Sequence, residues 1–148
     1  MSSTQTDLTV RRAVVVEAPA ERAFEVFTSG IASWWPLATH SLEGDAATDV
    51  AIEPHVGGAV YEDGPKGRQE WGEVTAWEPP SRLAFTWHLG RPEQQTEVEV
   101  TFTPVGGATR VELVHSGWER LEDGVDKSAG YTQGWAMILD RYAGVAAA

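Results

Sequence analysis

The chain has no cysteine and no asparagine. Without cysteine it can form no disulfide, offers no thiolate nucleophile and has no zinc site of the cysteine type. Without asparagine it has no acceptor for N-glycosylation. The start, MSSTQTDLTVRR, lacks the apolar core of a signal peptide, and no apolar run approaches the roughly 20 residues that a membrane helix needs. We therefore expect a cytoplasmic protein that does not span a membrane.

Basic residues are also scarce. The chain has 11 Lys and Arg against 22 Asp and Glu, which gives a formal net charge of -11. A surface this acidic repels phosphate backbones and anionic lipid. We therefore expect neither a nucleic-acid partner nor a membrane-surface partner, and the charge by itself predicts only good solubility.

Tryptophan, in contrast, is abundant, with seven residues in a chain of 148. The hydrophobic share of 42% and the charged share of 22% are typical of a soluble globule. This length favours one domain, which we expect to span residues 1–148 with an ordered core from about 8 to 143. The bulky indoles must either fill that core or line a cavity within it.

The segment 126–142, DKSAGYTQGWAMILDRY, has an aromatic stripe with helical spacing. Positions i, i+4, i+7, i+8 and i+11 share one face of a helix, and here they hold Tyr131, Trp135, Ile138, Leu139 and Tyr142. We expect a helix over 126–142 that needs a broad apolar surface, followed by a frayed tail over 143–148.

The upstream chain predicts that surface as a sheet. A strand over 8–17 and two short helices, over 21–28 and 31–35, are followed by an irregular loop over 37–48. Six further strands then alternate with tight turns, over 49–53, 59–63, 69–78, 82–89, 96–103 and 109–116. Short strands joined by tight turns predict an antiparallel meander, and the helices must cover its apolar face.

Alternation assigns most strand side chains to a face. The inner face receives the apolar positions, and the outer face, which includes Thr86, receives the polar and charged ones. Trp71 and Trp77 are in phase with polar residues, but a β-bulge would reverse their direction, so the pattern assigns them to neither face.

Four segments carry a resemblance to a known family: VGGAVYE at 56–62, WGEVTAWEPPSRLAFTW at 71–87, TEVEVTFTPVGGATRVELVHSGW at 96–118 and GYTQGW at 130–135. Together with the element order, they resemble the AHSA1-like family of the START/Bet v1-like (SRPBCC) superfamily over about 8–142. The resemblance implies an α+β helix-grip fold, with a curved seven-stranded antiparallel sheet around a long C-terminal helix. It also implies a hydrophobic cavity between sheet and helix. Members of the superfamily bind lipids, hormones or polyketides, and some are cyclases, resistance proteins or co-chaperones.

The candidate ligand-binding residues are those expected to face into the cavity of such a fold or to lie at its entrance. They are Trp34, Trp35, Val60, Glu62, Phe85, Trp87, Val100, Leu113, His115, Tyr131, Trp135 and Ile138. The alternative for each aromatic residue is that it simply packs in the core.

Two residues are candidates for catalysis. His115 is in phase with Val111 and Leu113, so an imidazole in the cavity could orient a ligand or transfer a proton; the alternative is a core histidine with satisfied nitrogens. Glu62 is in phase with Val60 and could act with His115, and the alternative is a solvated carboxylate at a strand end.

No motif indicates a metal or a cofactor. The four histidines lack metal-ligand spacing, and the glycine pairs do not lie between a strand and a helix as a phosphate loop requires. Three hypotheses follow. The first is binding of a small hydrophobic ligand, with or without an aromatic ring, and a role in stress or toxic-compound response. The second is a cyclase or hydrolase that uses His115, and the third is a co-chaperone-like interaction module; a homodimer is compatible with each.

Overall fold

The computed structural model describes residues 8–37, 39–88 and 95–147. Its elements, with η marking 3₁₀ turns, are β1 (Val10–Val16), α1 (Ala20–Thr28), η1 (Ile31–Ser33), η2 (Gly44–Ala46), β2 (Asp49–Ile52), β3 (Ala59–Asp63), β4 (Gln69–Glu78), β5 (Arg82–Trp87), β6 (Thr96–Val105), β7 (Ala108–Ser116), η4 (Trp118–Arg120) and α2 (Gly124–Ala147). The expected strand end at Leu89 lies outside the described residues.

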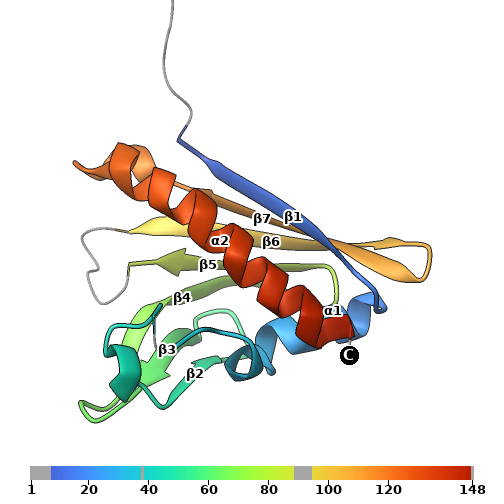
Figure 1. Cartoon of the computed structure of the whole chain (residues 1–148), viewed down its shortest axis with the longest axis horizontal. Coiled ribbons are helices and arrows are strands. Elements are labelled where there is room, and N and C mark those ends of the chain that lie inside the picture. Colours follow the sequence, from blue (N-terminus) through green and yellow to red (C-terminus); the bar gives the residue numbers. More distant parts are fainter. Residues whose placement is uncertain (1–7, 38, 89–94, 148) are drawn as a thin grey trace, which may run out of the picture.

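The strands form one seven-stranded sheet in the order β1-β7-β6-β5-β4-β3-β2. Strands β2 to β7 are sequential antiparallel neighbours, and β1 pairs antiparallel with β7, with Val10 opposite His115. Figure 1 shows α2 crossing one face of this sheet, with α1 beside the C-terminal end of the helix. The predicted fold class, a helix-grip sheet around a long C-terminal helix, is confirmed.

The inner face carries the apolar positions that alternation predicted. Leu83, Val100 and Leu113, from three neighbouring strands, are each 0% exposed. From α2, Leu139 and Tyr142 are buried against this face at the same 0%. The core therefore lies between the sheet and the aromatic stripe of the helix.

The helix is longer than the sequence predicted at both ends. It begins at Gly124, and it continues to Ala147 through the tail that was expected to fray. Alanine is the strongest helix former, and Ala146 is fully buried, so burial adds to propensity in this last turn. No helix in the described part of the chain is both long and apolar enough to cross a membrane.

A β-bulge in β4 decides the direction of Trp71. The β3 partners Val60 and Tyr61 pair with Gly72 and Glu70, so Trp71 is the extra residue, and its side chain is 0% exposed. The outer face was expected to be solvated, and at Thr86 this was wrong: the residue is buried, and its hydroxyl accepts the backbone N–H of Glu73 at 2.8 Å.

Candidate ligand pocket

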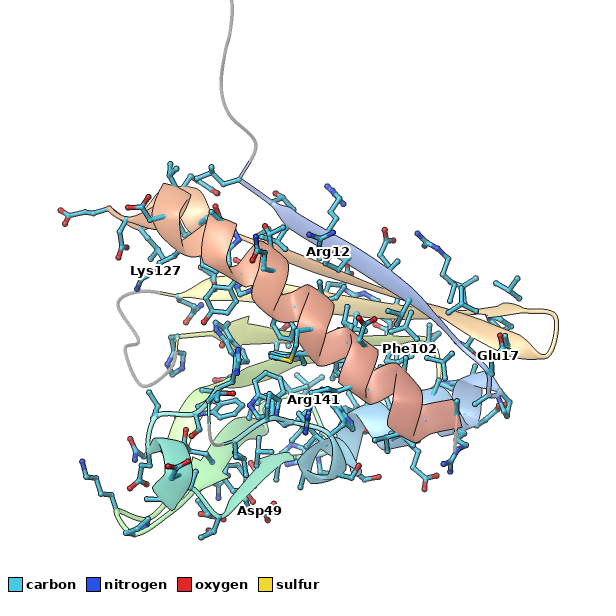
Figure 2. All side chains as sticks on the ribbon, viewed as in Figure 1. Arg12, Glu17, Asp49, Phe102, Lys127 and Arg141 are labelled. Carbon is cyan, nitrogen blue, oxygen red and sulfur yellow. The ribbon has the colours of Figure 1, made fainter. Side chains whose placement is uncertain are left out.

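A pocket of about 360 Å³ lies between the N-terminal part of α2 and the segment that follows η1. The helix wall consists of Asp126, Lys127, Gly130, Tyr131, Gly134, Trp135 and Ile138. The opposite wall is the segment 39–42, and the rings of Trp35 and Trp87 complete the lining. Lys127, labelled in Figure 2, lies in the N-terminal part of α2 and belongs to this wall.

Five of the predicted ligand-binding residues line this pocket: Trp35, Trp87, Tyr131, Trp135 and Ile138. The others lie elsewhere, buried among the remaining side chains of the core: Trp34, Val60, Glu62, Phe85, Val100, Leu113 and His115. For Trp34 the reason is visible, since its ring packs 5.1 Å from Phe27 and its indole donates to the Val26 carbonyl.

The pocket aromatics form a connected cluster. The centroids of Trp35, Trp87 and Trp135 lie 5.7 to 6.0 Å from one another. Their indole N–H groups are all satisfied: Trp35 donates to the His40 carbonyl, Trp87 to the Tyr131 hydroxyl and Trp135 to His115. The cluster thus presents ring surface without leaving an indole donor unpaired.

His115 lies behind this cluster and is 0% exposed. Its Nδ1 accepts the indole N–H of Trp135 at 3.0 Å, and because an indole can only donate, the imidazole proton must be on Nε2. That Nε2–H donates to Thr96 Oγ1 at 2.7 Å, and the Thr96 hydroxyl donates to the Trp87 carbonyl at 3.0 Å. Burial lowers the pKa of His115 to about 3, so the ring is neutral at pH 7. His115 therefore orients Trp135, and it is separated from the pocket.

Glu62 is buried at 0% exposure, so the alternative of a solvated carboxylate is wrong. One carboxylate oxygen accepts the backbone N–H of Leu42 at 2.6 Å and the indole N–H of Trp71 at 2.7 Å. The other accepts the backbone N–H of Glu43 at 3.1 Å. Glu62 consequently anchors the segment that forms one pocket wall.

The structure does not join His115 and Glu62 into a proton-transfer pair. The hydrogen-bond partners of His115 are Thr96 and Trp135, and those of Glu62 are three N–H groups. The indole of Trp71 donates to Glu62, whereas the ring centroid of Trp87 lies 6.2 Å from that of the His115 imidazole. Each residue supports a different part of the pocket.

The pocket also contains residues that the sequence did not single out. His40 lies in the wall, and its Nδ1 is 2.7 Å from Thr39 Oγ1. Gly130 and Gly134 lie on α2, and a Cβ built on either would meet no atom within 4 Å. Glycine weakens a helix, so two glycines with i, i+4 spacing on one face were the available signal for an opening there.

No group of three or more histidine, aspartate or glutamate side chains suited to a metal ion occurs among residues 8–37, 39–88 and 95–147.

A family model described as "Activator of Hsp90 ATPase homolog 1-like protein" matches residues 17–146. The chain belongs to this family. A search of curated proteins found no match. The family-model match over residues 17–146 confirms the family that the sequence motifs indicated.

Solved structures similar to this AHSA1-like chain include an anthrahydroquino-γ-pyrone synthase, Txn09. It is 38% identical, over 93% of this chain and 96% of the synthase, with a TM-score of 0.62. DynU16, from a dynemicin biosynthetic locus, is 25% identical over 93% of this chain and 46% of its own, with a TM-score of 0.70. The Aha1 dimer from Colwellia psychrerythraea is 20% identical over 88% of this chain and 90% of that one, with a TM-score of 0.66, and shows the fold alone.

Proposed function

We propose that this AHSA1-like protein binds a small, flat, largely apolar aromatic molecule in the pocket between α2 and the segment 39–42. The observation that carries the proposal is the set of four aromatic side chains around a cavity of about 360 Å³. Pockets of roughly 300–1,000 Å³ with mostly apolar lining and few polar groups are typical of small-molecule sites. The 38% identity to a synthase of a fused aromatic product supports an aromatic ligand.

The test fills the pocket from the helix side. Gly134→Leu places a side chain in open space within the pocket, whereas Gly144→Leu places one in open space on the same helix, outside the pocket. Both changes replace a poor helix former with a good one, so both variants should fold at least as stably as the wild type.

The probe is 2-(hydroxymethyl)anthracene, and the readout is quenching of tryptophan fluorescence. We expect saturable binding to the wild type and to Gly144→Leu with micromolar affinity, and at least about tenfold weaker binding to Gly134→Leu. Equal binding to both variants, or failure of the wild type to bind both this probe and 2-(hydroxymethyl)anthraquinone, would overturn the proposal.

A second candidate function is a ring-closing reaction on an aromatic polyketide in the same pocket. The identity to the pyrone synthase favours it over hydrolysis. His40 is the imidazole in the pocket wall, whereas both ring nitrogens of His115 are already hydrogen-bonded. This candidate predicts turnover of an anthrahydroquinone with an unclosed side chain, and loss of turnover with retained binding in His40→Ala. Turnover that survives His40→Ala would count against it.

The chaperone partner, the homodimer, the stress-related role and the cytoplasmic location stay predictions. Light scattering on a gel-filtration peak measures the oligomeric state directly. An affinity pull-down at low salt tests for a chaperone, because attraction through an acidic surface is strongest when screening is weak.

A further inference from the structure

Two tyrosines on α2 use their hydroxyl groups differently. Tyr142 donates its O–H to the Ala23 carbonyl at 2.6 Å. The Tyr131 oxygen instead lies 2.8 Å from Nε1 of Trp87, and because an indole nitrogen can only donate, this oxygen is the acceptor. The Tyr131 hydroxyl still has its own proton to donate, and no residue within 8–37, 39–88 or 95–147 accepts it.

The Tyr131 side chain is held in place at the pocket wall. Its ring lies 4.9 Å from Trp118 and 5.2 Å from His115, so packing on that side opposes rotation away from the pocket. Burial raises the pKa of Tyr131, although the Trp87 hydrogen bond acts in the opposite direction. The phenol therefore stays protonated at neutral pH, and the bond that it accepts from Trp87 strengthens it as a donor.

We propose that Tyr131 donates a hydrogen bond to a carbonyl oxygen of the ligand, so that the pocket selects aromatic ketones and quinones over aromatic hydrocarbons of the same shape. This inference rests on the proposed binding function, and it specifies the chemical class of the ligand. A carbonyl oxygen suits the site because it accepts one hydrogen bond and brings no proton that needs an acceptor among the rings of Trp35, Trp87 and Trp135.

The charges around the pocket disfavour an anionic ligand. Asp126 lies in the lining, and the chain carries a net charge of -11. Lys127 also lies in the lining, but its ammonium is 3.7 Å from the Asp123 carboxylate. A neutral carbonyl group accepts a hydrogen bond from the Tyr131 hydroxyl without placing a second negative charge beside Asp126.

The experiment compares two neutral probes of similar shape, 2-(hydroxymethyl)anthraquinone and 2-(hydroxymethyl)anthracene, which differ at the central ring, where the first has two carbonyl groups and the second two C–H groups. Tyr131→Phe removes only the hydroxyl group. Tyr61→Phe is the matched control, because Tyr61 lies on β3, with the Arg68 guanidinium 3.7 Å from its ring centroid, and does not line the pocket. Dissociation constants come from tryptophan quenching, with calorimetry as an independent check.

We expect the wild type and Tyr61→Phe to bind the anthraquinone about 3- to 10-fold more tightly than the anthracene. Tyr131→Phe should lose this preference because its affinity for the anthraquinone falls. A merely structural effect, such as a shift of Trp87 after it loses its acceptor, would weaken both probes equally.

Each other outcome has a distinct meaning. If both probes bind the wild type and Tyr131→Phe keeps the preference, or weakens both probes alike, the role of Tyr131 is refuted while the binding function stands. If both bind the wild type with equal affinity, selection of carbonyls is refuted. If neither probe binds the wild type, the proposed function itself fails, and this inference fails with it.

Discussion

The space between α2 and the sheet has a closed end and an open end, and both are aromatic. At the closed end, Phe24, Phe27, Trp34, Phe102 and Tyr142 pack with ring centroids 5.1 to 5.8 Å apart. Figure 2 labels Phe102 at this end, beside the C-terminal half of the helix. At the open end, Trp35, Trp87, Tyr131 and Trp135 surround the pocket.

The difference lies in what covers the rings. At the closed end, α1 inserts Phe24 and Phe27 between sheet and helix. At the open end, the cover is the segment 39–42, which belongs to no helix or strand and is held by Glu62. Aromatic residues alone therefore do not create a pocket; here the pocket lies where an irregular segment covers the rings and inserts no phenylalanine between sheet and helix.

The largest expected effect contrasts two neighbouring tryptophans. Trp34→Ala, at the closed end, should lower the free energy of unfolding by about 3–5 kcal/mol, because a full side-chain cavity forms in a packed core. Trp35→Ala should cost at least about 1 kcal/mol less, since one side of that ring already borders the pocket and has fewer contacts to lose.

Urea denaturation of both variants measures the difference. Equal costs would show that the two ends are packed alike and would break the comparison. Trp35→Ala should also weaken binding of 2-(hydroxymethyl)anthracene, whereas any binding loss in Trp34→Ala should follow only from unfolding.

A smaller effect is expected when the anchor of the open end is weakened. Glu62→Gln keeps the size of the side chain but turns one acceptor oxygen into an NH₂ group, which faces a backbone or indole N–H. A buried donor without an acceptor costs about 1–3 kcal/mol. The amides of Leu42 and Glu43 should exchange with solvent faster, and probe affinity should fall about 3- to 10-fold.

Hydrogen exchange of the closed end is the internal control for Glu62→Gln. The backbone amides of α1 should show no more loss of protection from hydrogen exchange than the loss of global stability accounts for. If exchange rises equally everywhere, Glu62 supports the whole fold rather than the pocket wall.

The smallest effect concerns pH and His115. The unfolded histidine binds a proton with a pKa of 6.5, and burial lowers the folded value to about 3. The stability is therefore complete above pH 6.5 and falls by roughly 1.4 kcal/mol per pH unit as the pH drops below that value. His115→Gln can keep both hydrogen bonds and does not titrate, so its stability should fall less between pH 7.5 and 5.5. Parallel pH profiles for the two proteins would contradict this.

Most of the fold could be predicted from the sequence because its patterns are regular. The alternation of Leu83, Phe85 and Trp87 and the stripe on α2 assigned the inner face correctly. Trp71 could not be assigned, because one extra residue in β4 reverses every direction that alternation predicts. Gly72, inside the strand, was the available signal for a bulge, but a glycine does not show which neighbouring residue is the extra one.

The site was harder to predict than the fold. The segment 39–42 has no periodicity, and its position depends on contacts with Glu62, about 20 residues away in the sequence. The alternation along the strands correctly predicted that Val60, Val100 and Leu113 lie in the core. It does not show which core residues border empty space. That depends on the lateral position of the helix over the sheet, which only the assembled structure contains.

The pairing of β1 with β7 has a consequence for how the chain folds. Val10 lies opposite His115, so the first strand acquires its neighbour only after almost the whole sheet has been synthesised. Contacts between residues so distant in sequence slow folding, and a strand that waits for its partner exposes backbone groups that other chains can capture. Rapid refolding should therefore require dilute protein, and peptides that compete for the edge of β7 should delay it.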